Sequence, residues 1–136
     1  MDFVKSLAIA AAGLRAQAGR MRVISENIAN ADSTSPQAGG DPYRRRIATF
    51  RSELDRTLGT RVVGLSKVAT DPSDFPTKYE PGHPAADAAG LVKYPNVNTL
   101  IEMTDMREAQ RSYDANVNVI SATRRMIERT IAILSA

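Results

Sequence analysis

Apolar side chains recur at alternating steps of four and three residues along the N-terminal part of the chain. The stripe consists of Phe3, Leu7, Ala10, Leu14, Met21, Ile24 and Ile28, and Gln17 is its one polar interruption. A sustained repeat of roughly 3.5 residues is typical of a helix that packs lengthwise against other helices. The pattern predicts a helix over residues 3–29. We expect its larger apolar residues to form a seam with partner helices.

The C-terminal segment carries a second, wider apolar pattern. Met106, Tyr113, Ile120, Ile127 and Leu134 are spaced seven apart, and Val117 and Ile131 flank them. A second row, formed by Val119, Met126 and Ile133, lies about 100° away around the helix. Two such rows are wider than one partner helix can cover, so a hairpin of the two helices would leave apolar surface exposed to water. We expect other subunits to cover it.

Proline divides the chain into three regions. All seven prolines lie between positions 36 and 95, together with six of the eight glycines. Proline is excluded from helix interiors because it lacks an N–H donor and its ring clashes with the preceding turn. We therefore predict an N-terminal heptad helix (1–30), a Pro/Gly-rich middle segment (31–97) and a C-terminal heptad helix (98–136). The predicted fold is mainly α, with the two helices forming one coiled-coil-like helical domain and a small β or irregular middle.

Short apolar runs in the middle segment predict short strands at residues 61–69 and 91–97. The stretch 47–58 fits two interpretations. Ile47, Phe50, Leu54 and Leu58 suit a helix, whereas residues 43–50 could extend as a strand. Gly59 is expected to end either element.

The amino-acid composition limits which catalytic and metal-binding sites the chain can form. Hydrophobic residues make up 43% of the 136 residues, but aromatic residues only 5%, and Trp and Cys are absent, which excludes disulfides, thiol nucleophiles and Cys-based zinc sites. His83 is the single histidine, and the neighbouring acids lack a catalytic or metal-ligand spacing. We expect no catalytic residue, no metal and no cofactor.

The net charge of +3 is weak evidence for nucleic acid. Arg44, Arg45 and Arg46 form the sharpest basic cluster, but no zinc finger, RNP-type motif or helix-turn-helix spacing accompanies it. A surface or intersubunit contact is the favoured interpretation of this cluster. No apolar run reaches the roughly 18 residues of a membrane span, although the basic N-terminal helix leaves peripheral membrane binding as an alternative.

The start of the chain resembles a secretory signal, with Lys5, an apolar run over residues 6–14 and the tripeptide 16–18. Arg15 interrupts that arrangement, and the heptad pattern continues unbroken beyond it. Cleavage after Ala18 would destroy half of the predicted helix. We therefore interpret this segment as an uncleaved helix.

Sequence blocks spread along the chain resemble a known family. Asn27, Asn30 and Thr34 lie in a polar cluster where the first helix is expected to end. Three blocks follow at 39–45, 79–87 and 92–98, and a fourth at 111–117. They contribute Pro42, Tyr43, Arg44, Tyr79, Glu80, Pro81, Gly82, Pro95, Asn96, Val97, Ser112, Tyr113, Ala115 and Asn116. In this order and spacing they resemble the bacterial flagellar rod and hook proteins over nearly the whole chain. His83, Leu91 and Glu26 depart from the residues expected there, at turns or a helix end.

The resemblance implies a structural subunit of the proximal rod of the flagellar basal body, which carries motor torque across the periplasm to hook and filament. It implies export through the flagellar type III apparatus without a cleaved signal. It also implies an oligomeric assembly with the rod proteins FlgB, FlgF and FlgG and the base protein FliE. The alternative is a small helical adaptor that binds one partner. An isolated chain is expected to be less helical than an assembled one.

Overall fold

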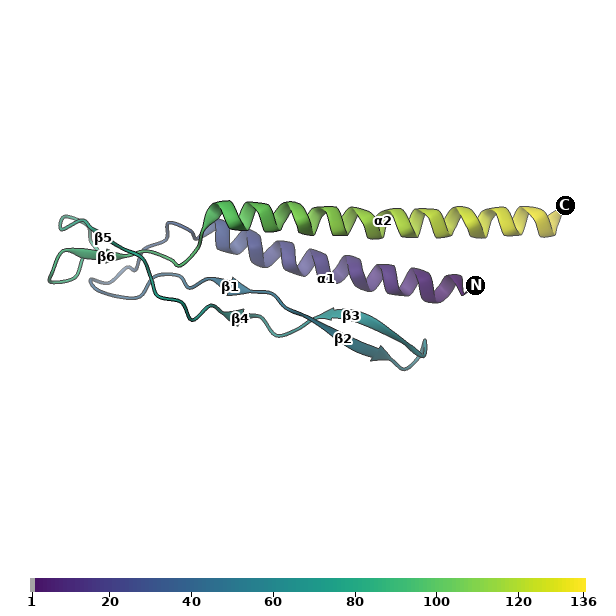
Figure 1. Ribbon diagram of the computed structural model, residues 1–136, viewed down its shortest axis with the longest axis horizontal. Helices are drawn as coiled ribbons and strands as arrows, with labels where there is room; N and C mark the ends of the chain where they lie inside the picture. Colours follow the sequence, from purple (N-terminus) through teal and green to yellow (C-terminus); the bar gives the residue numbers. More distant parts are fainter. Residues whose placement is uncertain (1) are drawn as a thin grey trace. The chain divides into compact units, whose positions relative to one another are not determined.

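A computed structural model describes residues 2–136 of the chain, so residue 1 of the predicted N-terminal region lies outside the described part. Along the chain, a long helix comes first, six short strands follow, and a second long helix comes last (Figure 1). Helix α1 spans Phe3–Ala29 and helix α2 spans Thr99–Ser135. The prediction of a mainly α fold, with a long helix at each end and a small β middle, is confirmed.

The strands form three separate antiparallel pairs. Strand β1 (Arg46–Ile47) pairs with β4 (Ala69–Thr70), β2 (Phe50–Asp55) with β3 (Thr60–Leu65), and β5 (Thr77–Tyr79) with β6 (Leu91–Lys93). The two interpretations of residues 47–58 are thereby decided in favour of strands. The predicted strand at 61–69 is divided into β3 and β4, and the one at 91–97 ends at Lys93.

The β2–β3 hairpin shows why strand pairing prevails over the helical spacing. Phe50 lies opposite Leu65 and Asp55 opposite Thr60, so the whole of β2 is paired. The Asp55 carboxylate accepts hydrogen bonds from the Thr57 and Leu58 backbone N–H groups. Gly59, with a φ of 61°, completes the turn. The prediction that Gly59 ends the element is confirmed.

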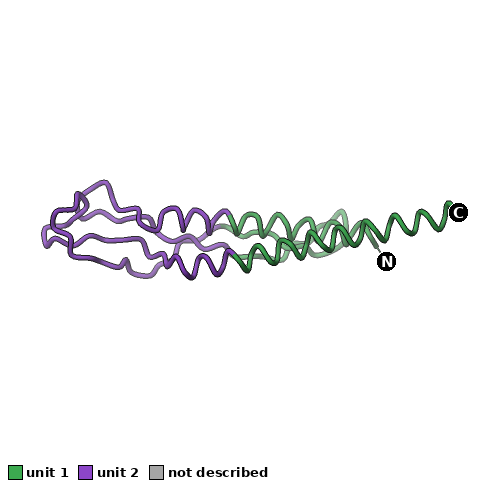
Figure 2. Tube along the Cα trace, turned by 90° about the horizontal axis from the view of Figure 1, so that it is seen from above, with its two compact units in different colours: residues 1–21, 49–67, 107–136 green, residues 22–48, 68–106 purple. Residues whose placement is uncertain are grey.

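The chain forms two compact units (Figure 2). Unit 1 contains residues 1–21, 49–67 and 107–136, and unit 2 contains residues 22–48 and 68–106. Each unit therefore takes part of both helices and part of the middle segment. Unit 1 holds the β2–β3 hairpin, and unit 2 holds the other two strand pairs.

Within unit 1 the two helices are antiparallel in a defined register. A Cβ atom on Gly13 would lie 2.7 Å from the Asn116 Oδ1 atom, so the Asn116 side chain packs directly over this glycine. Farther along, the Arg20 guanidinium donates to the Glu108 carboxylate at 3.4 Å. Gly13 faces Asn116 and Arg20 faces Glu108, so moving toward the start of α1 corresponds to moving toward the end of α2. By the same register Phe3 lies opposite about residue 126. The last turns of α2 therefore extend past the start of α1, as Figures 1 and 2 show.

The buried apolar side chains are mostly small. Six of the nine are alanines: Ala10, Ala12, Ala16, Ala31, Ala85 and Ala109. Nine large hydrophobic side chains of α2 are exposed in contrast, namely Leu100, Ile101, Met103, Val117, Val119, Met126, Ile131, Ile133 and Leu134. The single chain buries only a minority of the large apolar side chains that its helices carry.

Candidate functional site

Polar residues from five segments of unit 2 meet where α1 ends and α2 begins. Asn27 lies in the last turns of α1, the loop before β1 supplies Tyr43 and Arg45, and Glu102 lies in the first turn of α2. Asp71 follows β4. We call Asn27, Tyr43, Arg45, Asp71 and Glu102, together with Asn96, the junction cluster.

Asn27 is the centre of the junction cluster and is only 1% exposed. Its Oδ1 atom accepts hydrogen bonds from the Tyr43 hydroxyl at 2.8 Å and from the Arg46 backbone N–H at 2.9 Å. Its Nδ2 group donates to the Arg46 carbonyl at 2.8 Å and to the Glu102 carboxylate at 3.1 Å. All four hydrogen-bonding positions of the side-chain amide are thus used. Aspartate at this position would lose both donors and bring a second carboxylate next to Glu102.

Glu102 is a buried carboxylate, 1% exposed, at the N-terminal end of α2. The Asn98 side chain caps this helix by accepting from the Leu100 backbone N–H at 3.1 Å, and Glu102 lies one turn beyond this cap. Glu102 accepts from Arg45 Nε at 2.5 Å and from Asn27. The pairing, together with the positive end of the helix dipole, offsets the cost of removing the charge from water.

Arg45 joins helix α2 to the loop after β4. It contacts Asp71 at 3.4 Å and Asp105 at 3.9 Å in addition to Glu102. Burial works against the charged guanidinium, but the hydrogen bonds and charges of Glu102 and Asp71 outweigh it and raise the pKa of Arg45. The Ser73 backbone N–H and hydroxyl, followed by Arg45, lower the pKa of Asp71 below its ordinary value.

Two further side chains hold the loop that contains Asp71. Asn96 accepts from the Arg45 backbone N–H at 2.8 Å and donates to the carbonyls of Asp71 and Ser73, both at 3.2 Å. Arg44 donates to the same two carbonyls, each at 2.9 Å, and its guanidinium lies 4.1 Å from the centre of the Phe75 ring. The loop is therefore fixed from both sides by side chains of the same unit.

These contacts place Arg44 and Arg45 in the network of their own unit, while the Arg46 side chain is 51% exposed, so a surface or intersubunit contact of the Arg44–Arg46 cluster stays a prediction. Arg44 and Arg45 bind groups of their own chain, and Arg46 pairs with Glu26 at 3.0 Å. The sequence did not show this because the carbonyl and carboxylate partners of Arg44 and Arg45 lie 26 to 57 residues away.

The other motif residues of unit 2 form turns. Asn30 donates to the Glu26 carbonyl at 2.8 Å where α1 ends, and Thr34 is half-buried shortly after it. Glu80 accepts from the Tyr94 hydroxyl at 3.0 Å. Pro95 is buried, Pro42 and Val97 are half-buried, and Tyr79, Pro81 and Gly82 are exposed. His83 accepts from the Ala85 backbone N–H at 3.0 Å through Nδ1, which gives it a place in the turn.

The motif residues of unit 1 lie on α2. The Asn116 side chain lies over Gly13 and donates to the Ser112 carbonyl at 2.9 Å. Tyr113 is half-buried and Ala115 is exposed. These positions place the fourth sequence block where α2 comes close to Gly13 of α1.

The predicted seam residues differ in exposure within the single chain. Ile24 is buried, and most others are half-buried: Phe3, Leu7, Leu14, Met21, Ile28, Met106, Tyr113, Ile120 and Ile127. Val117, Ile131 and Leu134 are exposed, Leu134 by 82%. Gln17 is the polar residue that interrupts the apolar stripe of α1. Its Oε1 atom is buried without a hydrogen-bond partner among residues 2–136.

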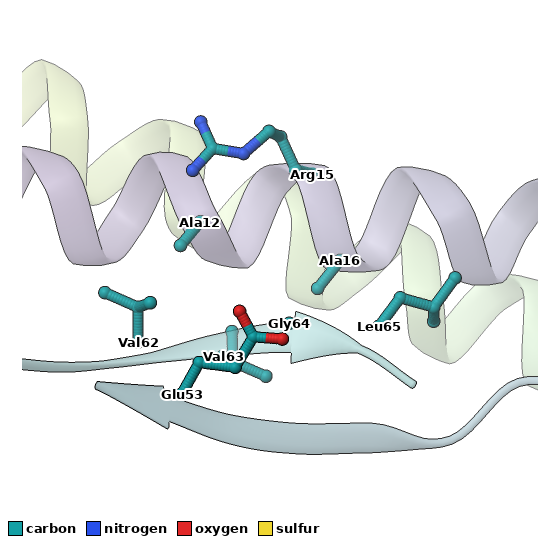
Figure 3. A pocket seen from close by; sticks show the side chains of 8 residues that line it. All are labelled: Ala12, Arg15, Ala16, Glu53, Val62, Val63, Gly64 and Leu65. Atoms are coloured by element: carbon teal, nitrogen blue, oxygen red, sulfur yellow. The ribbon is translucent and has the colours of Figure 1, made fainter. Parts of the chain in front are cut away.

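Unit 1 contains a shallow cavity of about 260 Å³ between α1 and the β2–β3 hairpin (Figure 3). Val62 and Leu65 of β3 face Ala12 and Ala16 of α1, and Glu53 adds a carboxylate that is paired with Arg51. Among residues 2–136 no three His, Cys, Asp or Glu side chains come together as a metal site. Over the same range, no helix is long and apolar enough to cross a membrane.

Comparison with known proteins defines the class of this fold. Residues 7–36 match the family described as flagella basal body rod protein. Residues 88–133 match the C-terminal family described as flagellar basal body rod FlgEFG protein. The first match covers the end of α1 with Asn27 and Asn30, and the second covers α2 with Glu102. The fold is thus that of a flagellar rod protein.

Full-length relatives narrow the class further. The chain is 56% identical over 128 residues to the flagellar basal-body rod protein FlgC of Agrobacterium fabrum, covering 94% of this chain and 92% of the relative. It is 38% identical to FlgC of Bacillus subtilis, covering 98% and 99%, and 40% identical to FlgC of Salmonella typhimurium, covering 92% of each. The chain belongs to the FlgC family of flagellar basal-body rod proteins. It is a structural subunit of the basal-body rod and not an enzyme.

Sequence reasoning did not identify Arg45, Asp71 and Glu102 as site residues. One signal was available for Glu102, because it is an acid placed between apolar residues 101 and 103 near the start of a predicted helix. Arg45 was named only as part of the basic cluster and of the block at 39–45, and Asp71 carried no signal.

Proposed function

We propose that this subunit builds the rod through its two helices, which pack with helices of neighbouring subunits in a coiled-coil-like arrangement. The observation that supports this proposal is that large apolar residues of α2 are exposed. The buried apolar residues, in contrast, are mostly alanine. Val119, Met126 and Ile133 form a row that α1 leaves uncovered, with Ile133 76% exposed. Burying such side chains against another subunit would contribute roughly 1.5–3 kcal/mol each.

The junction cluster has a different task in this proposal. It fixes the loop before β1 and the loop after β4 to the ends of both helices, so that the middle segment moves with the helices. A shaft that carries torque needs many stiff connections. The three predicted regions would then divide the work, with the two helical regions making the assembly domain and residues 31–97 meeting neighbours outside it.

Finer features of the proposal concern partners and export. Rod proteins FlgB, FlgF and FlgG and the base protein FliE are the proposed neighbours, and the periplasmic part of the rod is the proposed location. Export would proceed through the type III apparatus with residues 1–18 retained, because α1 runs unbroken from Phe3 past Ala18. Mass spectrometry of purified hook-basal bodies tests this feature, and a chain that begins at Gly19 would contradict it.

The helix seam is tested by charge substitution. Leu14→Asp and Ile120→Asp each place a carboxylate in the proposed seam, and we expect both to abolish rod incorporation and motility in a strain that lacks the wild-type protein. Gln110→Asp, at an exposed position on α2, is the matched control and should assemble. Normal motility with both seam variants would rule out the seam.

A further inference from the structure

The two units carry opposite net charges. Unit 1 holds 12 Lys and Arg against six Asp and Glu, a balance of +6. Unit 2 holds six Lys and Arg against nine Asp and Glu, a balance of −3. The modest charge of the whole chain therefore conceals two regions of opposite sign.

The basic excess of unit 1 is concentrated beside uncovered apolar surface at the end of α2. Arg124, Arg125 and Arg129 are exposed, and among residues 2–136 none of the three has an ion-pair partner. Exposed Ile131, Ile133 and Leu134 follow in the turns that extend past the start of α1. We call residues 117–135 of α2 the basic end. Its one acid is Glu128.

Unit 2 carries exposed apolar side chains at the start of α2 and exposed acidic side chains in its loops. Leu100, Ile101 and Met103 are exposed there, Leu100 by 73%. Asp32 is exposed in the turn that follows α1, and Asp74 is exposed next to Ser73, which is bound by Asn96 shortly before α2. We call these residues the acidic face. The junction cluster does not use any of these side chains.

We propose that the basic end of one copy docks on the acidic face of unit 2 of a second copy. Two basic ends repel each other, as do two acidic faces, so the charges disfavour the pairing of like surfaces and favour a basic end on an acidic face. A head-to-tail contact does not close on itself and can be repeated from subunit to subunit. The apolar side chains on both surfaces supply the burial, and the charges supply the orientation. This inference rests on the proposed packing of helices between subunits and adds the surfaces that direct it.

A charge-swap experiment on the purified full-length chain tests the contact. We expect the wild-type chain to self-associate in sedimentation velocity, and the association to weaken as salt rises. The triple variant Arg124→Glu, Arg125→Glu, Arg129→Glu should associate roughly tenfold more weakly. The variant Asp32→Lys, Asp74→Lys should also weaken. Mixing the two variants should restore association, because each then offers the charge that the other needs.

A matched control separates a specific contact from a general charge effect. Arg56→Glu, Arg61→Glu, Lys67→Glu changes the net charge of unit 1 equally at three exposed positions outside α2, and it should associate like the wild type. Circular dichroism verifies that each variant keeps the wild-type helix content. Association that ignores salt, a control that weakens equally, or a mixture that fails to associate would overturn the proposal.

Basal bodies distinguish this inference from the proposed rod function. A triple variant that enters the rod normally would show that the basic end is dispensable, while the chain remains a rod subunit. A wild-type chain that stays monomeric at every salt concentration, with the triple variant excluded from basal bodies, would assign the contact to a different rod protein and overturn the commitment to a second copy.

Discussion

The junction cluster of unit 2 and the α2 surface of unit 1 satisfy their side chains in opposite ways. Asn27 finds all four of its hydrogen bonds within the chain, and Glu102 is paired although it is almost completely buried. Ile133 and Leu134, in contrast, lie largely in water. The comparison shows that the junction cluster completes its polar contacts within the chain, whereas the large apolar side chains at the end of α2 remain exposed in it.

The largest expected effect concerns helix content in the isolated chain. Without neighbours, the uncovered turns of α2 lack the burial that offsets the entropy of ordering them. We expect circular dichroism to give less helix for the isolated chain than for assembled rods. Amide exchange should be faster in residues 117–135 than around Asn27. Equal helicity in both states, or equal protection of both regions, would remove the contrast between the units.

A second test removes a buried side chain of the junction cluster. Glu102→Ala leaves Asn27 and Arg45 without their carboxylate partner, and we expect a loss of about 3 kcal/mol in the free energy of unfolding, the lower end for a broken buried ion pair because Asp71 still faces Arg45. Glu108 lies on the same helix as Glu102 and forms an exposed ion pair with Arg20 of α1. Glu108→Ala removes this pair and should lower the free energy of unfolding by less than about 1 kcal/mol. Denaturant titration measures both, and similar losses would mean that burial does not strengthen the junction pair.

The turn between β5 and β6 gives a smaller effect. Gly90 has a φ of 79°, and a Cβ atom there would lie 2.8 Å from the Tyr79 ring. Gly90→Ala should therefore destabilise unit 2 by about 1–3 kcal/mol. Gly82→Ala is the control, since an added Cβ meets open space. The turn would be less constrained than described if both variants unfolded at the same denaturant concentration.

The smallest expected effect is a pH dependence at Asp71. Its folded pKa is lowered below the ordinary 3.8, so the ionised carboxylate stabilises the folded state above that value. This contribution disappears as the pH falls from 3.8 through the lower folded pKa. Asp71→Asn should be less stable than wild type at neutral pH, and the difference should shrink on acidification. A difference that stays constant with pH would show that the charge of Asp71 is unimportant.

Local patterns predicted the helices well. The spacing of apolar residues gave a helix over 3–29, and α1 spans Phe3–Ala29. The middle was harder, because residues 47, 50, 54 and 58 fit a helical period as well as a strand. Pairing of β2 with β3 decided the outcome, and that pairing involves a partner strand that the residues of β2 do not specify.

The site was predicted only in part. Asn27, Tyr43 and Asn96 were named through their motifs, but their common location was not. The hydrogen bonds of Asn27 reach residues 16 to 75 positions away, and no local pattern encodes such distances. Arg44 was named, yet its contacts with the carbonyls of Asp71 and Ser73 were not predicted, because a run of arginines has the same sequence signature whether it faces solvent or its own chain.

The sequence by itself determined where the two helices run, the apolar excess on α2 and the membership of the flagellar rod family. These properties depend on neighbouring residues and on blocks that keep their order, so they can be read along the chain. Only the tertiary structure decided that Asn27, Arg45 and Glu102 form one buried network, and that the end of α2 remains uncovered. Burial and hydrogen bonding depend on distances between segments, which the chain sets only when it folds.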